Sequence, residues 1–238
     1  MLSSNVVPGF LATGPASSQL PYPTMPVGAQ RVIRTALRHA WSVVRDHDSL
    51  NKLATASEPQ ITTVLQFALN ELLDDESEPV PGFSSNYFET IERGAEVVNY
   101  NGTRLEKRPD LRFRLQGRIP RVSDRTHYGL FVECKLLDSS HPLRLYGSNG
   151  IRRFVNGDYA WAMSHGLLLA YVRDATLTWA DLLRLLDNHR VEYNVLDRTE
   201  ASQGEDVARS HHGRAWQYPS SPHPPGSIEL AHLWLSLS

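Results

Sequence analysis

Two short apolar runs do most to limit what this chain can fold into: YGLFVECKLL at 128–137 and GLLLAYV at 166–172. Both runs carry apolar residues on both faces, which is typical of strands in the middle of a sheet that is covered on both sides. The residues between them, 150–166, carry apolar side chains at helical spacing. Strands that alternate with helices in this way predict an α/β fold, in which helices flank a central mixed sheet.

The rest of the sequence places two helices ahead of these runs and further elements after them. One helix is predicted from Arg31 to about Leu53 and another from Glu58 to Leu73, where Ser57 and Gln60 have the spacing of a capping box. Further patterns predict extended segments at 95–100 and 110–117, a helix at 178–190 capped by Thr178, a strand at 191–196, a long polar loop at 198–227 and a closing strand at 228–237.

Residues 1–30 differ from the remainder because they contain five prolines and three glycines but no charged side chain. Such a stretch predicts a flexible or surface-wrapping extension, followed by one domain over 31–238 with its core at about 58–174. The stretch has neither the basic start nor the continuous apolar run of a secretory signal. No segment of the sequence approaches the ~20 apolar residues of a membrane span.

The bulk numbers exclude some classes of protein and favour others. The formal net charge is −2, so the chain lacks the global basic field of a protein that coats nucleic acid. Its single cysteine, Cys134, excludes an intrachain disulfide and is typical of a reducing compartment. We therefore expect a cytoplasmic protein without a membrane segment.

Three ionisable residues fall at positions that a hairpin would bring together. Glu133 and Lys135 are two apart in an apolar run, so they share one face of the expected strand. Asp110 begins the extended segment 110–117 and can lie across from Glu133. Two carboxylates repel each other unless a cation lies between them, and such oxygen ligands suit Mg²⁺, which also takes waters and substrate phosphate. We predict that Asp110 and Glu133 bind Mg²⁺, with Mn²⁺ as a substitute ion.

The lysine beside this pair has a separate use. Lys135 can hold an attacking water or balance the charge that grows on phosphorus, and the set therefore favours hydrolysis of a phosphodiester. On spacing alone, a structural salt bridge between Glu133 and Lys135 remains the other explanation.

Pro109-Asp110 followed by Glu133-Cys134-Lys135 resembles the motif of the PD-(D/E)XK nuclease superfamily. The resemblance covers roughly residues 58–174, with a helix before the two strands and a helix and strand after them. It implies a restriction-endonuclease-like core and a metal-dependent DNA endonuclease, with restriction or defence against foreign DNA as the context by analogy.

That family often carries a further glutamate on the helix that precedes the sheet. Glu58 fits this position because it shares the inward face of its helix with Ile61 and Leu65. Glu71 lies further from that face and is the second choice. The resemblance thus implies Asp110, Glu133 and Lys135 as catalytic residues, with Glu58 as an auxiliary acid.

A local excess of positive charge flanks the predicted site. From Arg104 to Arg125 there are eight lysines and arginines and three acids, so the segment carries 8 − 3 = +5. Such a surface suits a phosphate backbone, and we predict that Arg112 and Arg114 contact nucleic acid. A solvated strand edge protected by charge is the alternative.

A second basic feature follows the turn at 147–150, which we expect to open a helix. Arg152 and Arg153 stand in its first turn, where a positive charge opposes the helix dipole and does not stabilise the helix. Helix N-termini also bind phosphate. Both arginines are therefore predicted nucleic-acid contacts, Arg153 foremost, although two solvated arginines fit the same pattern.

Two other functions fit the same residues and stay open. One is a catalytically inactive nucleic-acid- or protein-binding module on the same fold, and the other is an RNA nuclease. No separate sequence-reading module is visible, so target choice would come from a homodimer, a partner protein or DNA structure. Ser210, His212 and Arg214 alternate in the predicted polar loop, where they either fold over the site or are solvated.

Overall fold

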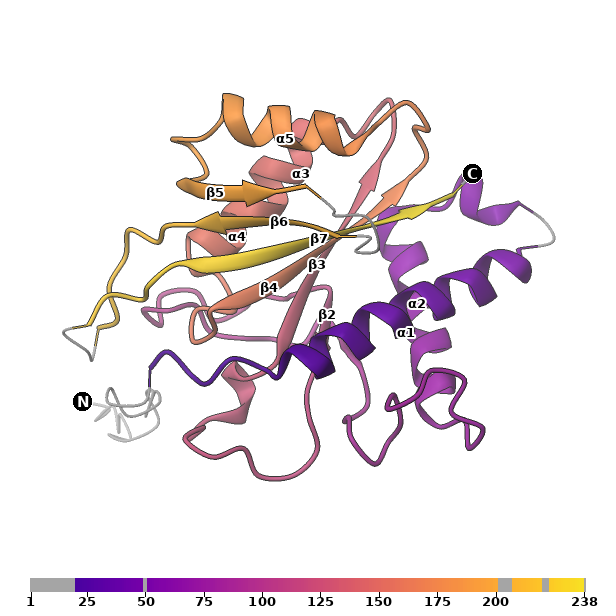
Figure 1. Ribbon diagram of the computed structural model, residues 1–238, viewed down its shortest axis with the longest axis horizontal. Helices are drawn as coiled ribbons and strands as arrows, with labels where there is room; N and C mark the ends of the chain where they lie inside the picture. Colours follow the sequence, from indigo (N-terminus) through magenta and orange to yellow (C-terminus); the bar gives the residue numbers. More distant parts are fainter. Residues whose placement is uncertain (1–19, 49–50, 201–206, 220–222, 238) are drawn as a thin grey trace, which may run out of the picture.

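The computed structural model describes residues 20–48, 51–200, 207–219 and 223–237 of the 238-residue chain. One mixed sheet of seven strands forms its centre, in the order β1-β2-β3-β4-β7-β6-β5 (Figure 1). Strands β3, β4 and β7 run parallel, and the strands on either side of them pair antiparallel. The predicted α/β class is confirmed. The strands are β1 (Glu92–Arg93), β2 (Leu111–Phe113), β3 (Leu130–Leu137), β4 (His165–Val172), β5 (Val195–Thr199), β6 (Val207–His212) and β7 (Ile228–Ser236).

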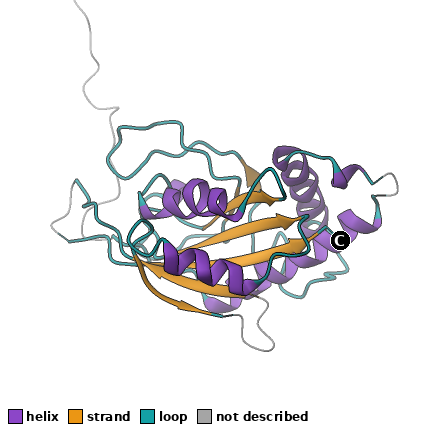
Figure 2. Ribbon diagram, turned by 90° about the horizontal axis from the view of Figure 1, so that it is seen from above, coloured by secondary structure: helices purple, strands orange, loops and turns teal. Residues whose placement is uncertain are grey.

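Helices lie on both sides of the sheet (Figure 2). The first two helices pack on one face, and the later ones pack on the other. The α-helices are α1 (Val27–Asp46), α2 (Glu58–Leu73), α3 (Leu143–Tyr146), α4 (Arg152–Val155) and α5 (Trp179–Asn188), the 3-10 turns are η2 (Lys52–Ala54) and η3 (Arg125–His127), and the π-helical turn η4 (Gly147–Ile151) joins α3 to α4.

The two central strands are buried along their whole length, as predicted. Side chains alternate along β3, so Val132 and Cys134 join the core under α1 and α2, whereas Phe131 and Leu137 join the core under α3 to α5. Glu133 and Lys135 alternate with the first set and therefore belong to the second face. A carboxylate and an ammonium thus occupy positions that apolar residues hold elsewhere in the strand.

The start of α2 follows the predicted capping box. Ser57 donates its backbone N–H to Gln60 Oε1 at 2.8 Å, and Glu58 becomes the first helical residue. Helix α5 starts in the same way, because Thr178 donates its backbone N–H to Asp181 at 2.9 Å. These local signals fix both helix starts independently of the tertiary contacts.

Two predicted helices have the wrong limits. The first helix spans Val27–Asp46 and ends before the predicted Leu53, with η2 following as a separate turn. The helix expected at 150–166 instead runs from Leu143 through η4 to Val155. Gly157 has a φ of +69°, a left-handed conformation that ends helices, and the apolar residues beyond it lie in loops.

Two other predictions fail in the extended segments. Residues 95–100 form no strand and keep one isolated bridge, between Val97 and Lys107. The predicted polar loop at 198–227 contains β6, which pairs with β7 along its length. The sequence of β6 is polar, but Ser210 and His212 are fully buried and hydrogen-bonded to each other. The strand expected at 191–196 is displaced to Val195–Thr199.

The predicted N-terminal extension is partly core. Residues 1–19 lie outside the described residues. Among those that follow, Tyr22 and Met25 are buried, and Tyr22 N–H donates to Ala162 O at 2.7 Å. The segment 20–26 therefore wraps the domain and is not a flexible tail. No helix in the described ranges is both long enough and apolar enough to cross a membrane.

Candidate active site

The candidate site lies at a fork where β2 separates from β3. The two strands pair from Phe113–Leu130 to Leu111–Val132. Asp110 directly precedes Leu111, so it lies just beyond the last of these pairs. Beyond the fork, two N–H groups of β3 point to side chains: Cys134 N–H donates to Asp110 Oδ2 at 2.7 Å, and Leu136 N–H donates to Glu58 Oε2 at 2.8 Å. Carboxylates thus satisfy a strand edge that would otherwise lack a partner.

Lys135 lies among three carboxylates that come from separate elements. Its Nζ is 2.6 Å from Glu133 Oε1, 3.3 Å from Glu58 Oε1 and 3.9 Å from Asp110 Oδ2. It also donates to Cys134 O at 2.6 Å. The structure therefore brings together the four predicted residues from α2, the start of β2 and β3.

Glu133 is the most buried member of this group, with an exposed fraction of 0%. Arg153 Nη1 lies 3.0 Å from its Oε1, and the Tyr159 hydroxyl donates to its Oε2. Oε1 therefore lies within hydrogen-bond distance of two cationic groups, Lys135 Nζ and Arg153 Nη1. The buried carboxylate is thus held by a lysine, an arginine and a tyrosine.

The electrostatics follow from burial and close charges. Burial raises the pKa of Glu133 to about 7, against the lowering effect of Lys135. Burial also raises the pKa of Asp110, and Lys135 again opposes the change. Burial lowers the pKa of Lys135 itself, but Glu133, Glu58 and Asp110 outweigh it, so the net pKa is raised. The lysine thus stays charged, whereas Glu133 gains and loses its proton near pH 7.

The residues present fit a hard divalent cation that needs few protein ligands. In the described ranges, no three histidine, cysteine, aspartate or glutamate side chains are arranged to hold a metal ion. Mg²⁺ needs fewer protein ligands, because it commonly keeps waters and takes one or two carboxylates. Asp110 and Glu133, whose carboxylates both lie beside Lys135, supply such a pair.

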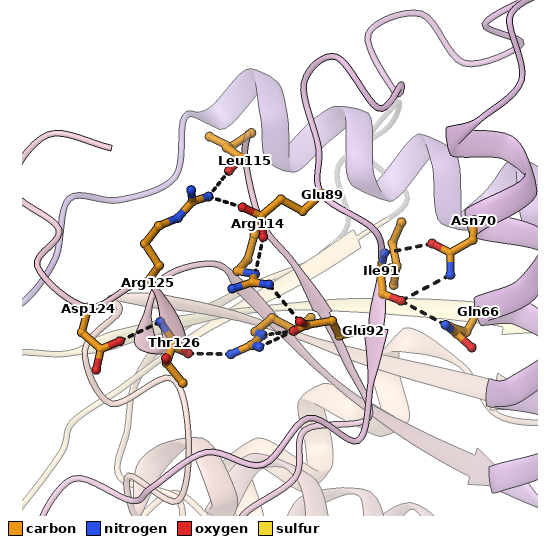
Figure 3. Close-up of polar contacts among 11 residues, drawn as sticks. Gln66, Asn70, Glu89, Ile91, Glu92, Arg114, Leu115, Asp124, Arg125 and Thr126 are labelled. Atoms are coloured by element: carbon orange, nitrogen blue, oxygen red, sulfur yellow. Dashed lines mark hydrogen bonds and ion pairs between the residues drawn. The ribbon is translucent and has the colours of Figure 1, made fainter. Parts of the chain in front are cut away.

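Arg112 and Arg114, two of the predicted nucleic-acid contacts, both form ion pairs with acidic side chains. Arg112 is 5% exposed, pairs with Glu92 and donates to Thr126 O at 2.7 Å. Arg114 bridges Glu89 at 2.7 Å and Glu92 at 2.8 Å (Figure 3). Both guanidinium groups instead hold the short strand β1 against β2.

Ion pairs also offset most of the positive charge of the segment 104–125. Its cations pair with Glu89, Glu92, Glu96 and Asp158, which lie outside 104–125 and were missing from the count. With these four acids the local charge falls from +5 to 5 − 4 = +1. Six of the eight basic residues make such pairs: Arg104, Lys107, Arg108, Arg112, Arg114 and Arg125.

The remaining predicted residues divide between the site and the surface. Arg153 reaches Glu133 from α4, so it belongs to the site. Arg152 is exposed and lies 3.6 Å from Glu192, a surface pair. Glu71 is exposed on α2, and no contact links it to the site in the described ranges, which favours Glu58 over it.

Sequence reasoning missed Tyr159 and the role of β6. Tyr159 lies in the segment 150–166 that was predicted to be a helix, and the pattern gives no signal that its hydroxyl reaches Glu133. Ser210 and His212 do not fold over the site, because they form a buried chain with His232 on the opposite side of the sheet centre. Arg214 is also buried, where it donates to backbone carbonyls such as Met163 O at 3.0 Å.

Comparisons with family models, curated proteins and solved structures gave no match to this chain. The function of the chain is therefore inferred from the geometry of Glu58, Asp110, Glu133 and Lys135.

Proposed function

We propose that this protein is a Mg²⁺-dependent nuclease that hydrolyses phosphodiester bonds, with DNA as the substrate. The observation that carries the proposal is the position of Lys135 Nζ among the carboxylates of Glu133, Glu58 and Asp110 at the fork of β2 and β3. Two acids and a lysine in this order along two adjacent strands agree with the PD-(D/E)XK motif.

The order of elements supports the finer fold assignment. Helix α2 precedes the antiparallel strands β1, β2 and β3, and α4 then leads to β4, which is parallel to β3. This helix, three strands, helix and strand correspond to the core expected from the restriction-endonuclease-like resemblance. Strands β5 to β7 extend the sheet beyond that core.

Asp110 and Glu133 would hold the ion. When bound, Mg²⁺ supplies positive charge to the phosphate and makes a bound water easier to deprotonate. Glu133 binds as the carboxylate, so its raised pKa means that the ion competes with a proton at this residue. Asp110 is also an acceptor for Cys134 N–H, which fixes its carboxylate at the strand end.

Lys135 and Glu58 have complementary tasks. Lys135 can hold the attacking water and offset negative charge that develops on the phosphoryl oxygens. Glu58 positions that ammonium group by an ion pair at 3.3 Å while it caps the N–H of Leu136. In the reaction, the water oxygen bonds to phosphorus, the bond to the 3′-oxygen breaks, and a 5′-phosphate and a 3′-hydroxyl result.

Arg153 and Tyr159 keep Glu133 in place from the helical side. The Arg153 side chain is 41% exposed, so part of its guanidinium remains accessible to a phosphate of the substrate. Of the four arginines predicted to bind nucleic acid, we retain Arg153.

A substrate panel tests the proposal. Purified protein is incubated with plasmid, linear single-stranded DNA and RNA, each with Mg²⁺, Mn²⁺ or chelator. We expect metal-dependent cleavage of DNA with 5′-phosphate products. Cleavage that survives full chelation contradicts the assignment, and preferential cleavage of RNA selects the RNA nuclease.

One observation favours a second candidate, a non-catalytic nucleic-acid-binding module. The charge of Glu133 is already balanced by Lys135 and Arg153 without an ion. The variant Lys135→Ala separates the two functions. A nuclease keeps or raises its metal affinity in calorimetry and loses ~10²-fold or more in turnover, whereas a binding module has no turnover to lose.

A further inference from the structure

A cleft of about 440 Å³ opens beside the C-terminal end of α4. Two aromatic rings line it, Tyr100 and Trp216, stacked with their centroids 4.4 Å apart and 22° between their planes. The other lining side chains are mainly polar and include Asn101, Asn156, Asn194, Arg104 and Asp158.

Gly157 fixes the two rings against the backbone. Its φ is +69°, and a Cβ at this position would lie 2.8 Å from the Trp216 ring and 2.9 Å from the Tyr100 ring. Tyr100 N–H donates to Gly157 O at 3.1 Å, and Trp216 Nε1 donates to Val155 O at 2.9 Å. The indole N–H of Trp216 is thus hydrogen-bonded within the protein, and both rings are anchored to the backbone at the end of α4.

Two chain segments connect the cleft to the candidate active site. Lys107 Nζ lies 2.9 Å from Asp158, which lines the cleft. Lys107 precedes Asp110 by three residues, so their Cα atoms are at most about 11 Å apart. On the other side, Asp158 directly precedes Tyr159, whose hydroxyl binds Glu133. A strand whose phosphate lies at Asp110 and Glu133 would therefore reach the cleft with a nucleotide a few positions away.

The lining has the chemistry of a nucleobase and not of a phosphate alone. An aromatic face offers stacking to any base, and asparagine amides both donate and accept hydrogen bonds as base edges do. Asp158 is neutralised by Arg104 at 3.0 Å and by Lys107, so it does not repel a nucleotide. The Arg104 side chain is 61% exposed, which leaves part of it accessible to the backbone of the strand.

We propose that the cleft between Tyr100, Trp216 and Asn156 binds one unpaired base of the substrate strand within a few nucleotides of the scissile phosphate. This inference rests on the proposed nuclease function and names its substrate class: single-stranded or locally unpaired nucleic acid. A base within an intact duplex has both faces stacked and would have to leave the helix to enter the cleft.

Binding of fluorescent oligonucleotides in the presence of chelator tests the inference without cleavage. A series of single strands, made as DNA and as RNA, carries one abasic position that moves along the chain. In the wild type we expect one position to weaken binding by about 5- to 150-fold, the range for one stacked base. Tyr100→Leu should weaken the intact strand by a similar factor and lose nothing further at that position.

Further controls make the result specific. Tyr100→Phe keeps the ring and should restore the wild-type pattern, and Tyr87→Leu changes a tyrosine that is 58% exposed outside the cleft. A duplex of the same sequence should bind more weakly than the single strand. A melting curve for each variant shows whether the domain is folded.

The outcomes separate the inference from the proposed function. If Tyr100→Leu binds every oligonucleotide as the wild type does, or if the duplex binds as tightly as the single strand, the cleft proposal is wrong. Metal-dependent cleavage in that case leaves the nuclease intact. If the abasic effect depends on Tyr100 but no metal supports cleavage, the cleft stands and the nuclease assignment fails.

Discussion

Glu58 and Lys135 are 77 residues apart in the sequence, and their side chains form an ion pair with Oε1 and Nζ 3.3 Å apart. Glu58 comes from the first turn of α2 and Lys135 from the middle of β3. The pair joins the helical layer to the sheet at the point where β2 and β3 separate. A helix start and a strand edge therefore define one site.

The first prediction concerns this pair. Glu58→Gln keeps the hydrogen bond to Leu136 N–H but removes the charge that positions Lys135. We expect turnover to fall by about 10- to 100-fold, a loss of roughly 1.4 to 2.7 kcal/mol of transition-state stabilisation, with metal affinity little changed. Glu71→Gln, at an exposed position of the same helix, is the matched control. Equal turnover for both variants would mean that Glu58 takes no part in the reaction.

The arginine network predicts a stability effect in place of a binding effect. Arg112→Gln breaks a largely buried pair with Glu92 and should cost on the order of 2 kcal/mol in the free energy of unfolding. The salt dependence of nucleic-acid binding should not change, because Arg112 contacts no phosphate. Arg118→Gln, at an exposed arginine of the same segment, should leave stability unchanged. A reduced salt slope in Arg112→Gln would restore the phosphate contact.

Residues 20–26 are expected to contribute to stability because they are packed. Met25 has an exposed fraction of 0%, whereas Val27, two residues later, is 66% exposed. Met25→Ala should lower the free energy of unfolding by about 2–5 kcal/mol, and Val27→Ala should change it by about 0.5 kcal/mol or less. Denaturant titration of the two variants measures the difference, and equal values would mean that this segment does not pack as described.

Stability should depend on pH through a buried histidine. His165 is 3% exposed, its ring nitrogens have no hydrogen-bond partner among the described residues, and burial lowers its pKa to about 4. Between pH 6.5 and about 4 the unfolded state therefore binds a proton that the folded state does not, so stability falls as pH falls. His165→Leu should remove this contribution and flatten the slope by up to about 1.4 kcal/mol per pH unit.

The difference between wild type and variant isolates this residue from the other groups. Glu133 acts in the opposite direction, since its raised pKa favours the folded state as pH falls below about 7. The free energy of unfolding is therefore measured at pH 7 and pH 5 for both the wild type and His165→Leu, and the changes of the two proteins are compared. Parallel stability profiles would show that His165 is not buried in its neutral form.

Local patterns were sufficient for the elements that depend on local chemistry. Ser57 and Gln60 fixed the start of α2, and the apolar run of β3 fixed a central strand with Glu133 and Lys135 on one face. The position of Asp110 across from Glu133 then follows from the pairing of β2 with β3. The residues that surround Lys135 could thus be predicted, although their chemistry is still a proposal.

The errors lie where distant partners change the meaning of a residue. Nothing in the local pattern indicates that Arg112 pairs with Glu92, because Glu92 is 20 residues earlier in the chain. Strand β6 looked like a loop because Ser210 and His212 are polar, but hydrogen bonds to His232 and Tyr193 O satisfy them inside the core. A periodic pattern shows which side chains are polar but not which ion pairs or hydrogen bonds satisfy them, so neither case was visible in the sequence.

Initial rates of DNA cleavage by the wild type and by Asp110→Asn, each in Mg²⁺ and in chelator, test the central claim most directly. The substituted side chain can still accept from Cys134 N–H through its amide oxygen, so the fold should persist while one negative ligand is lost. The account predicts cleavage with 5′-phosphate ends by the wild type in Mg²⁺, none in chelator and none by Asp110→Asn. Cleavage by Asp110→Asn at the wild-type rate would contradict it.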